Sequence, residues 1–444
     1  MNNTQGSRSF LQIAPSNQNA TISYRSGNPV INFIIGEQER FLLGHSVRFT
    51  GNISVYSEPD GDFGKIPLNA SGIGVSSKLG AYGMIDQIVI TSQKYKSVIE
   101  HCKHFGRYLA SYLPAVSSKS EALTSFSNMS GMMPNNLAQE LGFVSNVNGS
   151  AAADRAFRGN SFALNLPTGF LNSGTPIPLS GNGAGVGGIE IAIHLQPDSQ
   201  FLTASVANPN SFYQLTDVNL VCEVINPSID ELSRMMGSGQ GSMDYNAITG
   251  YYQTIQSSNA ILNLRLGLSR VLGFFVNFIP SNMLNNLNYD GFQTTPLIND
   301  LSTGEIAPIK QMVVLKGGSR IPFMYNLDAN VRDDADSQVS DPQLFRNYMN
   351  AFGNFMNNVR TQQSPLTNNR IGFTNQSNFI DSGLMFGIGV GLDNISGQGL
   401  DYRNENLSIQ LETGLTADNP HSAFLFVRSR QTLVFNQNGV QVIV

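Results

Sequence analysis

The most constraining stretch of this sequence covers residues 78–114, where the hydrophobic period changes from that of a strand to that of a helix. Ile85 and the run Ile88-Val89-Ile90 are apolar and β-branched, which is typical of a strand covered on both faces. Apolar residues then recur at i, i+4, i+7, i+11 and i+14, which predicts one helical stripe: Val98, Cys102, Phe105, Leu109 and Tyr112. Pro114 is expected to end this helix, because the residue before a proline is pushed out of the α region. The stretch therefore predicts a helix that covers part of a β framework.

Most of the remaining chain has the pattern of short strands separated by turns. Strands are expected in the first half at residues 30–35, 41–56, 162–167, 189–195 and 215–225, and in the second half at 274–279, 312–315, 383–392, 407–413, 424–435 and 440–444. Gly51 suggests a bulge in the second of these strands, and Gly317-Gly318 predicts a hairpin. We therefore expect an all-β chain of two β-sandwiches, each with about eight strands in two facing sheets, together with a few helices and long loops.

The domain organisation follows from a Gly/Ser-rich segment, MMGSGQGSMDY, near the middle of the chain. We expect an N-terminal arm at residues 1–29, a first jelly roll at 30–226, a linker at 227–246 and a second jelly roll at 247–444. Residues 117–160 and 326–380 lack a sustained period, so they are expected to be loops on the outward or lateral rim.

Charged residues make up only 13% of the 444 residues, against the usual ~25%. Aromatic residues at 9% argue against disorder, so the surface is expected to be folded and neutral-polar, as in proteins that pack against copies of themselves. The net charge is −5 and Lys and Arg do not cluster, which argues against direct binding to nucleic acid. Residues 1–10 lack the apolar core of a secretory signal, and no window approaches the ~18 apolar residues of a membrane span.

Two short motifs could carry chemistry, and each has a structural alternative. The glycines Gly183, Gly185 and Gly188 have dinucleotide-fingerprint spacing, but a strand is predicted after them in place of the required helix. We interpret them as a flexible loop. His101 and His104 could present two imidazoles on one helix face to a metal, but no third ligand is close in sequence. They are expected to be exposed helix residues.

Other candidate residues are equally weak. Asp333, Asp334 and Asp336 could hold Ca²⁺, but the EF-hand pattern is absent and a solvated acidic loop is the favoured interpretation. The cysteines Cys102 and Cys222 are far apart and are expected to be buried free thiols. Several N-x-S/T triplets are attributed to chance in an Asn- and Ser-rich chain; they include Asn52, Asn128, Asn375 and Asn406. The sequence predicts no catalytic, cofactor-binding or metal-binding residues, and no enzyme.

Four stretches resemble the double jelly-roll major capsid proteins of icosahedral DNA viruses. They are residues 79–113, with the pattern ID-x-I-x-I-x-S; 162–195, with NLPTGFLNSGTPIPL; 213–225, YQLTDVNLVCEVI; and 423–442, AFLFVRSRQTLVFNQNGVQV. The chain is most similar to the polinton-like virus and virophage branch, and more distantly to adenovirus-like and giant-virus capsid proteins.

The resemblance implies a structural role in a virion. Proteins of this kind form homotrimers with a pseudo-hexagonal outline, which tile an icosahedral shell. The implied partners are the chain itself, neighbouring capsomers, penton and minor capsid proteins, and an internal membrane as a further candidate. The implied location is the capsid, after synthesis in the host cell without a signal peptide.

A carbohydrate-binding or glycoside-hydrolysing β-sandwich protein is the alternative hypothesis. Loops rich in Asn, Asp and aromatic residues could bind sugar, although the chain has no Trp, which is the favoured stacking residue. Hydrolysis would require two carboxyl groups about 5–9 Å apart. The tertiary structure decides whether such a pair exists.

Overall fold

The structure, a computed structural model, describes residues 7–17, 21–27, 29–57, 64–66, 73–76, 79–116, 161–181, 183–204, 210–228, 240–287, 291–292, 309–321, 327–328, 351, 388–392, 399–413, 415 and 417–444. The predicted rim loop at 117–160 lies outside these residues, as does nearly all of the one at 326–380. Among the described residues, no helix is long and apolar enough to cross a membrane.

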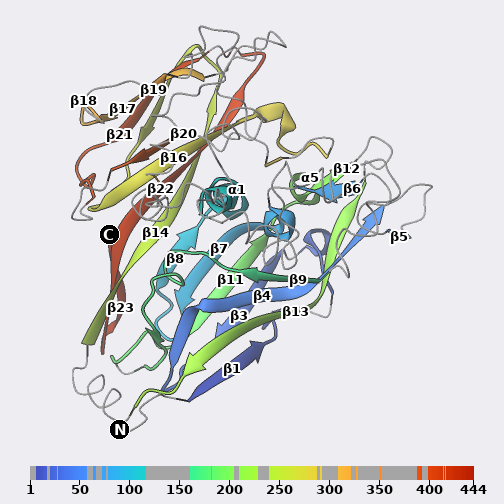
Figure 1. Cartoon of the computed structure of the whole chain (residues 1–444), viewed down its shortest axis with the longest axis vertical. Coiled ribbons are helices and arrows are strands. Elements are labelled where there is room, and N and C mark those ends of the chain that lie inside the picture. Colours follow the sequence, from blue (N-terminus) through green and yellow to red (C-terminus); the bar gives the residue numbers. More distant parts are fainter. Residues whose placement is uncertain are drawn as a thin grey trace, which may run out of the picture.

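The first half of the chain forms two main antiparallel sheets, in the lower part of Figure 1. One follows the order β1-β13-β4-β10 and carries β2, β5 and β9 on its strands; the other has the order β3-β11-β7-β8. The two sheets face each other, because Phe33 of β3 and Phe49 of β4 meet edge to face with ring centroids 6.0 Å apart. A small third sheet pairs β12 with β6. The strand bounds are β1 Arg8–Ile13, β2 Thr21–Ile22, β3 Val30–Ile35, β4 Phe41–Ser57, β5 Gly64–Ile66, β6 Ile73–Val75, β7 Ile85–Ser92, β8 Val98–Cys102, β9 Ser161–Asn165, β10 Ile177–Pro178, β11 Ile189–Leu195, β12 Leu202–Ala204 and β13 Phe212–Ile225.

The second half also forms two antiparallel sheets, which occupy the upper part of Figure 1 and extend down its left side along β14, β22 and β23. Their orders are β14-β22-β16-β20, with β23 beside β22, and β15-β21-β17-β18, with β19 beside β17. The bounds are β14 Gln240–Ile255, β15 Asn259–Leu264, β16 Val271–Pro280, β17 Ile309–Lys316, β18 Ser319–Arg320, β19 Leu327–Asp328, β20 Ile388–Gly391, β21 Leu407–Thr413, β22 His421–Asn436 and β23 Gly439–Ile443. The helices of the described chain are η1 Tyr24–Ser26, η2 Gly80–Met84, α1 Phe105–Val116, α5 Asp198–Phe201 and η4 Ser281–Met283.

The two halves share one strand order. Eight strands of each half lie on the sheet paths: β1, β3, β4, β7, β8, β10, β11 and β13 in the first half, and β14, β15, β16, β17, β18, β20, β21 and β22 in the second. Counted among these eight, the first strand pairs with the last, and the last also pairs with the third: β1-β13-β4 in the first half and β14-β22-β16 in the second. In each, the second strand pairs with the penultimate one: β3-β11 and β15-β21. Two sheets of four path strands connected in this way are a jelly roll. The predicted all-β fold of two consecutive eight-stranded jelly rolls is therefore confirmed.

Several local predictions can be compared with the strands. The bounds of β3, β11 and β21 are those predicted, and the hairpin between β17 and β18 turns at Gly317 and Gly318, both with positive φ. The bulge expected at Gly51 lies in its partner strand β13, where the register shifts between Thr216 and Asn219. Two strands lie in segments for which the sequence predicted an arm and a linker. β1 lies within the predicted N-terminal arm but belongs to the first sheet, and β14 begins at Gln240, inside the predicted linker.

The predicted helix of residues 98–113 was wrong in both of its limits. Val98 and Cys102 belong to strand β8, which pairs with β7, and helix α1 begins only at Phe105. A separation of four residues puts two side chains on one face of a strand as well as of a helix, so the stripe did not distinguish them. Pro114 does not end the helix, which extends to Val116. The adjoining Leu113 is buried in the core, and this packing outweighs the local preference.

Candidate functional site

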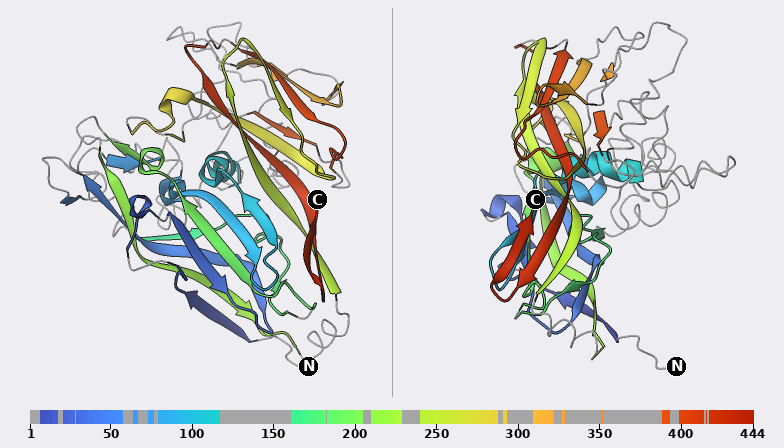
Figure 2. Two further views of the ribbon diagram at one scale, coloured as in Figure 1. Left: turned by 180° about the vertical axis from the view of Figure 1, so that it is seen from behind. Right: turned by 90° about the vertical axis from the view of Figure 1, so that its left-hand side faces the viewer.

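The best-defined site of the described chain is the junction between the two jelly rolls. Helix α1, strand β8 and the loop of residues 166–173 reach it from the first roll, and β14, β16 and β22 reach it from the second. Figure 2 shows α1 in the space between the two rolls. Buried apolar residues of both rolls form one continuous core here.

Glu100 of β8 is the central polar residue of this junction and is 4% exposed. Its carboxylate accepts hydrogen bonds from three backbone N–H groups: Phe170 at 2.8 Å, Gly169 at 3.0 Å and Ile248 at 3.3 Å. The first two donors belong to the first roll and the third belongs to β14 of the second. Burial raises the pKa of the Glu100 carboxyl, and the three donors oppose that rise. One side chain thus joins two segments of the first roll to the second.

Close backbone contacts surround this carboxylate. A Cβ on Gly169 would lie 1.9 Å from the carbonyl oxygen of Asn246, and one on Gly250 would lie 2.5 Å from that of Lys103. Neither position can hold a side chain unless the backbone moves. In addition, the Tyr245 hydroxyl of β14 donates to the Ile99 carbonyl of β8 at 2.7 Å.

Helix α1 makes the second set of polar contacts across the junction. Ser111 donates to Asn277 Oδ1 of β16 at 2.9 Å, and Asn277 Nδ2 donates to the Arg107 carbonyl at 3.2 Å. The Arg107 guanidinium is buried, lies 4.5 Å from the ring centroid of Phe424 in β22, and donates to the Gly291 carbonyl. These bonds satisfy polar groups that would otherwise be buried without partners.

Aromatic rings fill the space between α1 and the second roll. Tyr108 lies 5.9 Å from Phe275 and 5.9 Å from Phe426, which stack on each other with centroids 5.0 Å apart. Tyr112, one turn further along the helix, stacks on Tyr108 at 5.0 Å. Such contacts add to the stabilisation from area burial alone.

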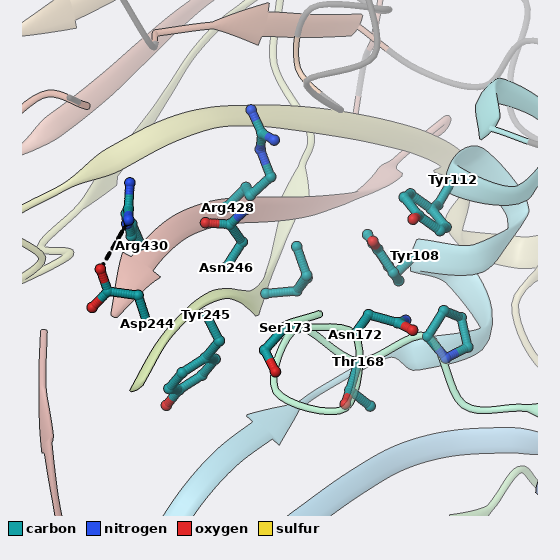
Figure 3. A pocket seen from close by; sticks show the side chains of 13 residues that line it. Tyr108, Tyr112, Thr168, Asn172, Ser173, Asp244, Tyr245, Asn246, Arg428 and Arg430 are labelled. Carbon is teal, nitrogen blue, oxygen red and sulfur yellow. Dashed lines mark hydrogen bonds and ion pairs between the residues drawn. The ribbon is translucent and has the colours of Figure 1, made fainter. Parts of the chain in front are cut away.

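A cavity of 390 Å³ opens beside these rings (Figure 3). Its side chains come from α1, the loop of residues 166–173, β14 and β22; they include Tyr108, Tyr112, Thr168, Asn172, Ser173, Asp244, Tyr245, Asn246, Arg428 and Arg430. Asp244 is the one carboxylate among its described lining residues. It pairs with Arg430 at 2.9 Å and accepts a hydrogen bond from the Thr432 hydroxyl at 2.6 Å. The Thr432 and Arg430 hydrogen bonds lower the pKa of Asp244, so this side chain suits neither a general acid nor a carboxylate pair.

The structure places the predicted motif residues as follows. His101 lies in β8 and His104 lies just before α1, and both are half-buried, so the prediction of exposed residues on one helix face was wrong. The glycines belong to the loop between β10 and β11. There Gly187 N donates to Ser180 O, and Gly188 N donates to Leu179 O, both at 2.9 Å. The prediction that these glycines lie in a loop is confirmed.

The cysteines Cys102 and Cys222 are buried and free, as predicted. Asn52 donates to Asp217, and Asn406 is exposed. The remaining candidates lie outside the described residues: Asp333, Asp334, Asp336, Asn128 and Asn375. Among the described residues, no group of three or more His, Cys, Asp or Glu could hold a metal ion.

Sequence reasoning missed Glu100 and Arg107, the charged residues buried at the junction. A signal was present in each case, because each is a lone charge beside apolar residues: VIEHC around Glu100 and FGRYL around Arg107. Such a charge is buried only where partners from elsewhere in the fold satisfy it. The partners come from residues far away in sequence, so the sequence pattern alone did not identify them.

Comparisons with known proteins agree with this architecture. No protein-family model matches the chain, and no curated protein sequence matches it. Solved structures do match over nearly the whole chain. The Faustovirus major capsid protein has a TM-score of 0.62 at 9% identity, covering 98% of this chain and 92% of that one. PBCV-1 VP54, fitted into a cryo-EM reconstruction of the virophage Sputnik, has a TM-score of 0.57 at 10% identity, covering 100% and 98%.

The chain has the double jelly-roll fold of these proteins. A cryo-EM structure of the Sputnik virophage also matches, with a TM-score of 0.54 at 10% identity, covering 99% of this chain and 89% of that one. Each of these three alignments covers at least 98% of this chain, so the likeness includes both jelly rolls. Since Faustovirus, PBCV-1 and Sputnik structures all match, the likeness does not single out the polinton-like and virophage branch.

Proposed function

We propose that the chain is a major capsid protein whose homotrimers are pseudo-hexagonal capsomers of an icosahedral viral shell. The observation that carries the proposal is the pair of jelly rolls with one strand order, joined by a buried junction into a double jelly roll. Three such chains present six similar rolls, which approximate a hexagon. The full-length likeness to the Faustovirus major capsid protein supports this reading.

The geometry of the junction also supports a shell role. Glu100 and Arg107 link the rolls through buried hydrogen bonds, so each chain can act as one rigid building block. We further propose that the strands of residues 8–225 and 240–443 are the two domains. The proposed partners are neighbouring capsomers, penton and minor capsid proteins and, where the virion contains one, an internal membrane. The proposed location is the virion, and catalysis is no part of the role.

Light scattering coupled to size-exclusion chromatography tests the proposal on the purified full-length chain. The expected mass is near three times 48.2 kDa and stays constant on dilution. Negative-stain microscopy of the same peak should show particles with a hexagonal outline. A monomer at every concentration would contradict the capsomer and favour the alternative of a sugar-binding β-sandwich.

A further inference from the structure

Three of the five histidines of the chain lie together where the first jelly roll meets the second. His194 of β11 pairs with Gln87 of β7, and His101 of β8 pairs with Val89, two residues further along β7. His104 lies in the turn between β8 and α1. We call His101, His104 and His194 the histidine cluster.

Two hydrogen bonds connect His101 to Asp86 through Gln87. Gln87 Nε2 donates to Asp86 Oδ2 at 3.0 Å, which leaves Gln87 Oε1 as an acceptor. His101 Nε2 lies 2.9 Å from that oxygen and therefore carries the ring proton. His104 Nδ1 lies 3.9 Å from Asp86 Oδ1. Asp86 thus faces the cluster as a carboxylate.

His104 is the member of the cluster that touches the second roll. Its ring centroid lies 5.1 Å from that of Phe424 in β22 and 6.3 Å from that of Tyr252 in β14. Its φ of +53° is in the left-handed region, which a histidine occupies only when its surroundings hold it there. A cavity of 430 Å³ at this point is lined by His104, His194 and residues of both rolls, so these two imidazoles face a space shared by the rolls.

The charges around the cluster are mostly positive. Lys103, in the turn before α1, and Arg107 of α1 act on His104, and Asp86 is the one described carboxylate that acts on it. Tyr24 and Tyr252 are the other titratable residues lining the cavity. Protonation of the three imidazoles would add three positive charges next to these two cations, and Asp86 could balance only one of the added charges.

Burial lowers the pKa of all three imidazoles below the ordinary value, and Asp86 opposes that shift at each of them. Parting of the rolls exposes to water the two imidazoles that line the cavity, those of His104 and His194, and brings their pKa towards the ordinary value of about 6.5. The open state therefore binds protons more readily than the closed one. Acidification through that range therefore stabilises the open state relative to the closed one.

We propose that the histidine cluster is an acid-sensitive latch, which holds the two jelly rolls together while its imidazoles are neutral and loosens when they are protonated. The latch belongs to the folded chain and does not depend on the proposed capsid role. When the latch loosens, His104 moves away from Phe424 and Tyr252 while both rolls stay folded.

The two buried cysteines report on this parting. Cys102 adjoins the junction, where its thiol lies close to Glu100, whereas Cys222 lies in β13, opposite Leu11 of β1 and within the first roll. The full chain is exposed to N-ethylmaleimide at pH 7.5 and pH 5.5, and labelling at each cysteine is followed by peptide mass spectrometry. Thiols react more slowly with this reagent at lower pH, and the ratio of the two labelling rates removes this effect because both cysteines share it.

We expect the Cys102-to-Cys222 labelling ratio to rise by about fivefold at the lower pH. The variant His104→Asn should remove most of this rise, since Asn lacks the charge but tolerates a positive φ. His194→Gln should reduce the rise in part, and His45→Gln, which alters an exposed histidine outside the cluster, should leave it intact. A labelling ratio that does not change with pH, including equal acceleration at both cysteines, would overturn the latch. A full rise of the ratio in His104→Asn would overturn it as well.

Discussion

Replacing Glu100 by alanine tests the junction most directly, because it removes a single acceptor shared by three buried backbone donors. Each buried N–H left without a partner costs about 1–3 kcal/mol, and loss of the buried carboxylate offsets part of the sum. We therefore expect the free energy of unfolding to fall by about 3 kcal/mol, near the lower end for three orphaned donors. Glu100→Gln keeps one acceptor oxygen and should cost less, about 1–2 kcal/mol.

Urea unfolding followed by circular dichroism measures the overall loss. Hydrogen exchange measures it at the donors themselves, in peptides that contain Gly169, Phe170 and Ile248. A loss of about 3 kcal/mol corresponds to exchange faster by on the order of 100-fold, since each 1.4 kcal/mol is a factor of ten. The matched control is Glu190→Ala, which removes an exposed ion pair with Lys96 and should cost no more than about 1 kcal/mol. If Glu100→Ala leaves both the urea midpoint and these exchange rates unchanged, the carboxylate does not hold the rolls together.

Further substitutions test the other contacts of the junction. Gly169→Ala should lower the free energy of unfolding by about 1–3 kcal/mol, because its Cβ would meet the backbone of β14. The control is Gly36→Ala, whose Cβ would meet nothing within 4 Å. Equal melting temperatures for the two variants would contradict the close approach of Gly169 to β14. Asn277→Leu should cost about 1–3 kcal/mol in urea unfolding, because it removes the hydrogen bonds from the Ser111 hydroxyl and to the Arg107 carbonyl. Ser111→Ala should therefore cost less in this variant than in the unchanged protein. If the second change only adds to the first, the hydrogen bond is not the cause.

The sequence by itself determined the strands that have clear alternation, together with the repeated architecture. Alternation of apolar and polar residues has a period that only a half-buried strand satisfies, so β11 and β21 could be predicted with their limits. Gly317 and Gly318 likewise predicted a hairpin from local sequence, because glycine adopts a positive φ without steric strain. These features depend on neighbours in sequence, which a single chain displays directly.

Only the tertiary structure decided how the rolls are joined. Val98 and Cys102 satisfy both a strand and a helix, and it was pairing with β7 that made their segment a strand. The burial of Glu100 depends on donors from the loop of residues 166–173 and from β14, and the gathering of His101, His104 and His194 depends on the register of three strands. Sequence spacing says little about such contacts, because residues far apart in the chain supply the hydrogen-bond partners that offset the desolvation of a buried charge.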